Sequence, residues 1–258
     1  MEKSPVSVII PAYNEERNIG DCLRSVAWAD DVWVVDGGST DRTREIASSL
    51  TPNILQTDNN LAEFQRLKVM DRIRNRWFLF LDADERVGEG LRRSIEEAVR
   101  APEPKAAYAV LRRNLYRGKP IHLHHPDYQM RLFRKDALVS LPEKIHREPV
   151  VNGPVGRLEG ELAHHFFTNV QDYLKKLNTY STAEASYWSG RQVSGGRLFY
   201  WLALRPAARF FQYYVLRKGF LDGYFGLFYS VSSAYYEWAV ASRFLVDSRT
   251  PTGARNAS

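Results

Sequence analysis

The sequence has a single cysteine, Cys22, and lacks a glycine-rich phosphate-binding loop. One thiol excludes an internal disulfide and a cysteine-based zinc site, so we expect a reducing compartment, the cytoplasm. The loop at 11–16 (PAYNEE) lacks the glycines with which dinucleotide-binding folds approach a pyrophosphate, and no Gly-x-x-x-x-Gly-Lys motif occurs. NAD, FAD and Walker-type nucleotide binding are therefore not expected.

Long hydrophobic runs are also missing. The longest uncharged run in the last quarter of the chain, residues 223–236, has 14 residues, short of the roughly 18 to 20 needed to cross a bilayer. Glu2 and Lys3 lead directly into a short apolar strand, so no signal peptide is expected. With 258 residues, 44% of them hydrophobic, the chain can bury a large core, which predicts one catalytic domain with an appendage.

Charge favours phosphate-rich partners. Lys and Arg outnumber Asp and Glu by 36 to 30, which gives a net charge of +6 and an isoelectric point near 9.4. Nucleotides, anionic lipid and nucleic acid all fit this balance. Nucleic acid is not expected as the partner, because the aromatic residues cluster in a helical tail and not on a recognisable single-strand-binding module.

The first hundred residues alternate between two patterns. Strands are expected at 6–10, 31–36, 53–57 and 77–81, and helices at 15–29, about 41–50, 61–75 and 89–100. Such alternation predicts an α/β fold with a mostly parallel sheet and helices on both faces. Functional residues should then lie in the loops that follow the strands.

The apolar run 77–81 ends in three carboxylates, Asp82, Asp84 and Glu85. Residues at i and i+2 of an extended chain point the same way, so Asp82 and Asp84 can face one cleft at the carboxyl end of their strand. Two hard oxygen ligands suit Mg²⁺ or Mn²⁺, which keeps open positions for substrate phosphates. The pair indicates a metal site for a nucleotide diphosphate. The alternative is a solvated turn whose acids favour the N-terminus of the following helix.

A second loop, residues 36–41 (DGGSTD), follows another strand. The Asp36 carboxylate can accept hydrogen bonds from a base or ribose, and Gly37 and Gly38 allow close approach. An ordinary glycine turn before a capped helix would read the same way. The two interpretations stay open on this loop alone.

Taken together, three segments resemble family 2 glycosyltransferases with the GT-A fold: VSVIIPAYNEE at 6–16, VVDGGSTDRT at 34–43 and LDADE at 81–85. The likeness is closest to the β-glucosyltransferases of the lipopolysaccharide core, and it extends through 127–133, 146–156 and the aromatic C-terminal tail. It implies a Rossmann-like GT-A domain and inverting transfer of a sugar from a nucleotide diphosphate sugar, commonly UDP-linked. The implied acceptor is a hydroxyl of a lipid-linked glycan.

The resemblance also implies roles for residues at matching positions. Tyr13 would lie near the base, Glu15 near the ribose, and Arg131 near the diphosphate. The implied nucleotide-binding set is Pro11, Ala12, Tyr13, Glu15, Asp36, Gly37, Asp82, Ala83 and Arg131. A divalent metal would be held by Asp82 and Asp84, and His164 stands where the family often has a histidine after a leucine. These residues would stabilise the leaving diphosphate.

A separate carboxylate must take the proton of the attacking hydroxyl. Relatives commonly have His-Glu where this chain has His146-Arg147-Glu148, so either Glu148 reaches the acceptor or the base is Asp127, and we favour Glu148. The altered loop also motivates an alternative function, a non-catalytic sugar-nucleotide-binding scaffold in a membrane glycan-assembly complex.

The last quarter of the chain is aromatic and basic. Residues 197–247 hold 16 of the 33 aromatic residues, interspersed with arginines. Pro206 can open one helix, and Tyr224, Val231 and Trp238 recur at helical spacing on another. Such helices suit the headgroup layer on the inner face of the cytoplasmic membrane, as a peripheral contact. A helical subdomain packed on the sheet and a homodimer face are the alternatives.

These patterns give a domain plan. We expect a GT-A catalytic domain over 1–165, with a nucleotide-binding half at 1–100 and an acceptor half at 101–165. An amphipathic helical region follows at 166–247, and a disordered tail at 248–258.

Overall fold

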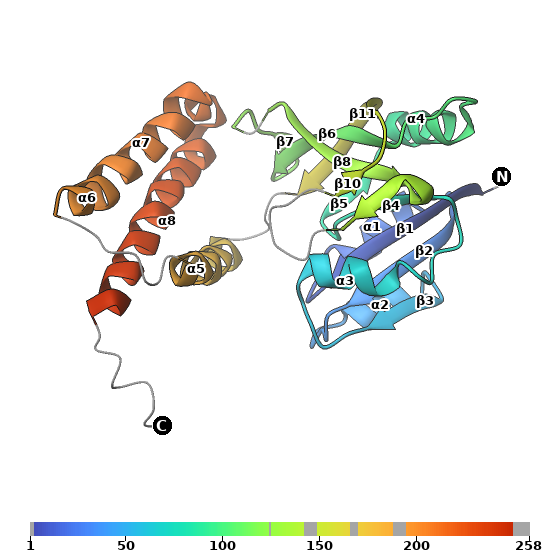
Figure 1. The fold of residues 1–258 in the computed structure, drawn as a ribbon, viewed down its shortest axis with the longest axis horizontal. Helices are drawn as coiled ribbons and strands as arrows, with labels where there is room; N and C mark the ends of the chain where they lie inside the picture. The colour runs from blue at the N-terminus through green and yellow to red at the C-terminus, as the bar shows by residue number, and fades with distance from the viewer. Residues whose placement is uncertain (1–2, 124, 142–148, 166–169, 188–194, 250–258) are drawn as a thin grey trace. The chain divides into compact units, whose positions relative to one another are not determined.

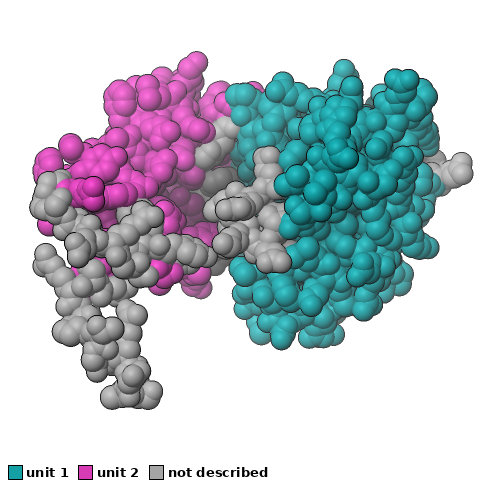
Figure 2. Space-filling model, viewed as in Figure 1, with its two compact units in different colours: residues 1–115, 126–166 teal, residues 116–125, 167–258 magenta. Residues whose placement is uncertain are grey.

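The computed structural model describes residues 3–123, 125–141, 149–165, 170–187 and 195–249 (Figure 1). The chain divides into two compact units (Figure 2). The first unit comprises residues 1–115 and 126–166, and the second comprises 116–125 and 167–258. The second unit therefore includes a short excursion, residues 116–125, from within the strand-rich part of the chain.

The first unit begins with four parallel strands: β1 (Ser4–Ala12), β2 (Ala29–Asp36), β3 (Asn53–Gln56) and β4 (Trp77–Phe80). Their order in the sheet is β3-β2-β1-β4. The helices α1 (Ile19–Ser25), α2 (Thr43–Ser48) and α3 (Ala62–Val69) connect them. The expected alternation is confirmed, although each of these helices is shorter than expected. At α1 the reason is local: Asn14 adopts a left-handed φ of 55° and residues 15–18 form a turn before the helix starts.

The sheet continues from β4 with strands of both directions, in the order β4-β8-β6-β11-β5. These strands are β5 (Glu85–Val87), β6 (Ala107–Tyr116), β8 (Asp127–Arg134) and β11 (Val155–His165), and α4 (Glu89–Arg100) follows β5. β8 runs antiparallel to β4 and β6, β11 is parallel to β6, and β5 is antiparallel to β11. A short 3₁₀ turn (Lys135–Ala137) precedes β9 (Leu138–Ser140), which pairs separately with β10 (Val150–Val151).

The sheet buries both of its faces. Along β1, Val8 and Ile10 point into one apolar cluster, and Ile9 points into another on the opposite side. On that second side, the Phe78 and Phe133 rings stack with their centroids 5.3 Å apart. Near-continuous apolar strands of this kind are typical of sheets covered on both faces. The mostly parallel sheet with helices on both faces is thus confirmed.

The second unit is built mainly of helices. It contains the short strand β7 (Lys119–Pro120), α5 (Val170–Tyr187), α6 (Gly195–Phe199), a π-helix (Tyr200–Leu204), α7 (Arg205–Phe211), a second π-helix (Gln212–Leu216), a 3₁₀ turn (Gly219–Asp222) and α8 (Gly223–Arg249). Pro206 lies in the first turn of α7, as expected, although helical backbone of the first π-helix already precedes α7 without a break. Proline has no N–H to donate to the preceding turn, and that turn is the π-helical one.

Ion pairs inside the second unit hold its helices together. Glu237 on α8, only 3% exposed, accepts hydrogen bonds from Arg205 and Arg209 of α7, which lies beside α8 (Figure 1). The Asp222 carboxylate accepts the backbone N–H groups of His122 and Leu123 at 2.8 and 3.0 Å. This carboxylate fastens the 116–125 excursion to the helices.

Large apolar side chains are concentrated on the surface of the second unit. Of those that are exposed within the described part of the chain, 7 lie in the first unit and 17 in the second. On α8, Tyr224, Leu227, Val231, Tyr235 and Trp238 are all exposed, and their spacing of three or four residues puts them on one side of the helix. None of the helices, over the residues described, is long and apolar enough to span a membrane.

Candidate functional site

The carboxylates that follow β4 form a closed turn between β4 and β5. Asp82 donates its backbone N–H to the Glu85 carboxylate at 3.0 Å, and the Glu85 N–H returns to the Asp82 carbonyl at 2.9 Å. Glu85 is fully buried and begins β5. The turn therefore has a fixed shape, with Asp82 and Asp84 placed at its outer edge, where their side chains are 32% and 21% exposed.

Two arginines form ion pairs with the Asp82 carboxylate. Arg66 from α3 lies 2.5 Å from Oδ1, and Arg131 from β8 lies 2.9 Å from Oδ2. Burial raises the pKa of Asp82, but the charges of Arg131 and Arg66 outweigh it and hold this pKa well below its usual value. Asp82 is therefore a firmly ionised group that is neutralised by the protein itself.

Arg131 also binds the buried Glu85, at 2.5 Å. Burial raises the pKa of Glu85, and the neighbouring Asp82 charge adds to the rise, while Arg131 opposes it. Arg131 is only 6% exposed, so its first task in this structure is to hold the acidic turn. The expected contact of Arg131 with a diphosphate stays a prediction.

Asp84 faces a histidine from another strand. His164 near the end of β11 has its Nε2 3.4 Å from Asp84 Oδ2, and its Nδ1 lies 2.5 Å from Oδ1 of Asn114 on β6. The strand register explains this meeting, because His164 is the neighbour of Glu85 on β5 and of Asn114 on β6. Two of the three expected metal-binding residues are thus brought together, while both Asp82 oxygens face arginines.

No set of three or more His, Cys, Asp or Glu side chains suited to a metal ion occurs among the described residues. The pair Asp84 and His164 would therefore have to be completed by oxygens from outside the protein. Mg²⁺ and Mn²⁺ commonly bind this way, through one or two protein ligands, waters and substrate phosphates. The residues present fit such an ion.

Asp127, one of the two candidate bases, is enclosed by hydrogen-bond donors. Gln129 Nε2 lies 2.7 Å from Oδ1, while Arg112 Nε and Asn114 Nδ2 lie 2.8 and 3.2 Å from Oδ2. Burial raises the pKa of Asp127, but the bonds from Gln129 and Arg112 outweigh it and lower this pKa. A carboxylate whose lone pairs are already bonded is poorly suited to accept a proton. The other candidate, Glu148, lies outside the described residues.

The loops at 11–16 and 36–43 are joined by hydrogen bonds. Asn14 is central: its N–H donates to Ser39 Oγ at 2.9 Å and its Oδ1 accepts the Thr40 N–H at 2.8 Å. The Glu15 N–H donates to Thr43 Oγ1 at 2.7 Å. Tyr13 projects from this joined pair of loops with 42% of its surface exposed. Pro11 and Ala12 end β1 as buried neighbours of Val35 and Asp36 on β2.

Asp36 and Gly37 serve the loop itself in this structure. Asp36 is fully buried, and its carboxylate accepts the Gly38 and Ser39 N–H groups at 3.2 to 3.3 Å. A Cβ on Gly37 would lie 2.7 Å from Cα of Asn60, so the close approach that this glycine permits is made by the chain's own 59–60 backbone. The glycine-turn interpretation is thus satisfied, and it leaves little of Asp36 to meet a ligand directly.

Sequence reasoning missed three residues of this cluster: Arg66, Arg112 and Asn114. Each contacts an acid or histidine that lies at least thirteen positions away in the chain. Arg112 pairs with Asp127 across the β6–β8 ladder. Only the strand register could have identified the partners of Arg112 and Asn114, and only the packing of α3 could have identified the partner of Arg66. Neither is readable from local spacing.

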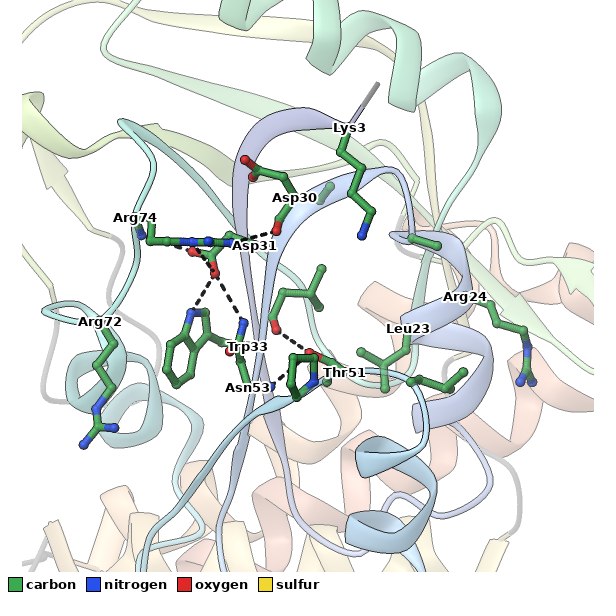
Figure 3. A pocket seen from close by; sticks show the side chains of 15 residues that line it. Lys3, Leu23, Arg24, Asp30, Asp31, Trp33, Thr51, Asn53, Arg72 and Arg74 are labelled. Carbon is green, nitrogen blue, oxygen red and sulfur yellow. Dashed lines mark hydrogen bonds and ion pairs between the residues drawn. The ribbon is translucent and has the colours of Figure 1, made fainter. Parts of the chain in front are cut away.

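A cavity of about 450 Å³ lies at the opposite edge of the sheet, at the amino ends of β1, β2 and β3 (Figure 3). Asp31 is buried beneath it, and it accepts hydrogen bonds from Ser7 at 2.6 Å and Trp33 at 3.0 Å. Arg74 adds an ion pair at 3.5 Å. The acid is therefore already neutralised and bonded. Ligands of open α/β sheets bind at the carboxyl ends of the strands, where Asp82 and Asp84 lie.

A GT-A-like sheet with acids at its carboxyl edge is the arrangement expected of a glycosyltransferase, and comparison of the sequence with family models gives the same class. Residues 7–153, more than half of the chain, match the model of the family "Glycosyl transferase family 2". The chain belongs to this family of glycosyltransferases.

Comparison with individual proteins identifies relatives within this family. The chain is 26% identical over 252 residues to the lipopolysaccharide core biosynthesis glycosyltransferase LpsC of Rhizobium meliloti, covering 93% of this chain and 92% of that protein. It is also 26% identical to an uncharacterized glycosyltransferase of Rickettsia prowazekii, covering 89% of this chain and 83% of that protein. The expected resemblance to the lipopolysaccharide-core type is confirmed.

Among solved structures, glucosyl-3-phosphoglycerate synthase from Mycobacterium tuberculosis, in complex with phosphoglyceric acid, is similar with a TM-score of 0.50. The identity is 16%, and the match covers 74% of this chain and 82% of that one. This likeness concerns the fold, and it agrees with the expected GT-A class.

Proposed function

We propose that this glycosyltransferase moves a hexose from a nucleotide diphosphate sugar, UDP-hexose, to a hydroxyl of a lipid-linked glycan, with inversion at the sugar. The acceptor would be an intermediate of bacterial envelope polysaccharide or lipopolysaccharide. One observation carries the proposal: the Asp82–Glu85 turn lies at the carboxyl edge of the sheet with His164 facing Asp84. The similarity to LpsC over nearly the whole chain supports the class of acceptor.

The joined loops at 11–16 and 36–43 would receive the nucleoside. Their shape is fixed by hydrogen bonds from Asn14 to Ser39 and Thr40, so little conformational entropy is lost when a ligand binds. Tyr13 offers an exposed ring for the base. Glu15, which accepts a hydrogen bond from Asn18 at 2.7 Å, would contact the ribose. Asp36 and Gly37 would act by holding the loop.

Asp84 and His164 would hold a divalent cation, Mg²⁺ or Mn²⁺. A carboxylate oxygen and an imidazole nitrogen 3.4 Å apart are two lone-pair groups that a cation between them would stabilise. When bound, such an ion neutralises charge on the diphosphate that leaves. Asp82 would contribute through the turn and through its arginines.

Arg66 and Arg131 are the two arginines that pair with the Asp82 carboxylate. Each keeps a buried Nε–H without an acceptor among the described residues, and the Arg66 guanidinium also lies over the Phe80 ring at 5.0 Å. Guanidinium groups form charge-assisted hydrogen bonds with phosphate oxygens. We assign Arg66, with 18% of its side chain exposed, to the departing diphosphate, and the more deeply buried Arg131 to supporting the turn.

The proton of the attacking hydroxyl goes to Glu148 in this proposal. The alternative, Asp127, accepts three hydrogen bonds and has a lowered pKa, which weakens it as a base. Glu148 follows β9 in the sequence and precedes β10. This assignment rests on the sequence resemblance together with the three hydrogen bonds that the Asp127 carboxylate already accepts.

The second unit would bring the enzyme to its lipid-linked acceptor. Exposed rings on the first π-helix, α7 and α8, among them Tyr200, Phe211, Tyr224 and Trp238, suit the layer between lipid headgroups and acyl chains. The contact would be peripheral, on the inner face of the cytoplasmic membrane. The same surface could instead join two copies of the chain as a homodimer.

Turnover of nucleotide sugars tests the proposal. UDP release should be seen with a lipid-linked saccharide acceptor and one hexose of a UDP-sugar panel, and EDTA should abolish it. Undiminished UDP release in EDTA would contradict the proposed metal requirement. Binding of a UDP-sugar without turnover on any acceptor would instead support a sugar-nucleotide-binding scaffold.

A further inference from the structure

Four neighbouring strands carry a continuous line of polar side chains. The sheet order β8-β6-β11-β5 places Asp127 on β8, Asn114 on β6, His164 on β11, and Asp84 immediately before β5. Asp127 Oδ2 accepts from Asn114 Nδ2 at 3.2 Å, Asn114 Oδ1 lies 2.5 Å from His164 Nδ1, and His164 Nε2 lies 3.4 Å from Asp84. Each contact joins strands that are adjacent in the sheet.

The Asp127 carboxylate determines the orientation of the Asn114 amide. An ionised carboxylate only accepts hydrogen bonds, so the end of the amide that faces it must be the NH₂ group. The lowered pKa of Asp127 agrees with an ionised group. The carbonyl end of Asn114, which is 3% exposed, then faces the histidine.

The Asn114 carbonyl in turn determines the His164 tautomer. A carbonyl oxygen only accepts, so His164 Nδ1 must carry the hydrogen that it donates to Asn114. In the neutral ring Nε2 then has the lone pair, and Nε2 is the nitrogen directed at Asp84. A histidine binds a metal through a nitrogen with such a lone pair, and a hydrogen bond from its other nitrogen fixes the ring.

We propose that Asn114 and Asp127 are positioning residues that hold His164 in its Nδ1–H form, with Nε2 presented beside Asp84 to a divalent cation. The inference rests on the proposed function for the cation, but the tautomer itself does not. Arg112 and Gln129 complete the line by holding Asp127 at 2.8 and 2.7 Å. Asp127 would thus act through Asn114 and not on the acceptor hydroxyl.

The tautomer can be measured without metal or substrate. In the ¹⁵N-histidine-labelled protein, long-range ¹H–¹⁵N spectra at a pH where the ring is neutral should show His164 protonated at Nδ1, with the resonance assigned by its loss in His164→Gln. Asn114→Leu, which keeps the branched shape and removes the acceptor, should shift His164 toward the Nε2–H form. Asp127→Leu removes the acceptor of the Asn114 NH₂ group, so it should shift the tautomer in the same direction and provides the test if Asn114→Leu does not fold.

Mn²⁺ affinity is the second measurement. With UDP present, the Mn²⁺ dissociation constant from electron paramagnetic resonance should rise about 10- to 100-fold in Asn114→Leu and Asp127→Leu. The swapped pair Asn114→Asp with Asp127→Asn keeps an acceptor for His164 and a donor beside it, and it should recover both the tautomer and most of the affinity. Arg113→Gln is the matched control. Arg113 directly precedes Asn114 on β6 and pairs with Glu161, so this variant should change neither the tautomer nor the Mn²⁺ affinity.

The two levels of the inference can fail separately. An unchanged His164 tautomer in both Asn114→Leu and Asp127→Leu would overturn the positioning roles. A wild-type protein with the Nδ1–H form that binds no Mn²⁺ would support the line of hydrogen bonds and overturn the cation in the proposed function.

Discussion

The Arg131 guanidinium and the Glu85 carboxylate form a 2.5 Å ion pair, with only 7% and 0% of their side chains exposed. Glu85 also accepts the Asp82 N–H and so shapes the acidic turn. Removing one partner of a buried pair leaves an uncompensated charge in a medium that solvates it poorly. The pair therefore stabilises the acidic turn, and its loss should weaken both folding and ligand binding.

Arg131→Met should lower the free energy of unfolding by about 3 to 5 kcal/mol, because Glu85 would stay buried without its cation. Urea denaturation measures this. Arg76→Met is the control: Arg76 pairs with Asp136 at 3.0 Å, but the two side chains are 60% and 52% exposed, so its cost should stay below about 1 kcal/mol. Equal losses in the two variants would refute a supporting role for Arg131.

Asp84→Asn and Asp82→Asn should affect Mn²⁺ differently. Asp84 faces His164, whereas both Asp82 oxygens are bound by arginines. We expect Asp84→Asn to weaken Mn²⁺ binding in the presence of UDP on the order of 100-fold, or about 2.7 kcal/mol. Asp82→Asn should change it less than about tenfold and act more on stability. Calorimetric titration decides, and a larger effect from Asp82 would restore it as the principal ligand.

Glu148→Gln and Asp127→Leu should lower turnover for different reasons. If Glu148 accepts the proton, its replacement should reduce kcat about 10²- to 10⁴-fold with UDP-sugar binding preserved. Asp127→Leu should lose activity through weaker cation binding, so raised Mn²⁺ should recover much of it. Steady-state kinetics over a Mn²⁺ series separates the two. Near-full turnover in Glu148→Gln would show that the base lies elsewhere.

Replacing Tyr224, Tyr235 and Trp238 on α8 with serine should reduce co-sedimentation with vesicles of phosphatidylglycerol and phosphatidylethanolamine at least about tenfold, because these exposed rings are the proposed lipid contact. The matched control replaces Val139, Val150 and Val155, which are exposed on the first unit, and should bind vesicles as the wild type does. Gel filtration tests the alternative. A wild-type dimer that becomes monomeric in the α8 variant, with no vesicle binding in either protein, would contradict the lipid contact and identify this exposed side of α8 as a homodimer face.

Strands with strong periodicity were predictable, and contacts between distant strands were not. β1, β2 and β4 are apolar runs that must be buried, and local composition is enough to find them. β5 is only three residues long and contains Glu85 and Arg86, so it exists because β11 supplies a partner and not because its residues favour a strand. Local pattern carries no record of such pairing.

The candidate site shows the same division. Asp82, Asp84 and His164 were identifiable because acids after a buried strand and a family-like histidine are local signals. Asn114 was not, since an asparagine inside a strand gains its meaning only from Asp127 and His164, which lie on the strands at either side of it. For Arg131 the sequence resemblance implied a role at the diphosphate, whereas its burial beside Glu85 is a tertiary property that local pattern does not show.

The position of β11 between β6 and β5 bears on the order in which the chain folds. Asp84 and His164 are 80 residues apart in the sequence, and they meet only through the pairing of β11 with β5. Closing so long a loop is slow compared with the local pairing of β1, β2 and β3. During synthesis the nucleoside loops can therefore form well before the histidine arrives. We expect glycosyltransferase activity to appear last, once β11 has paired, and after the loops at 11–16 and 36–43, which we propose to bind the nucleotide, have formed.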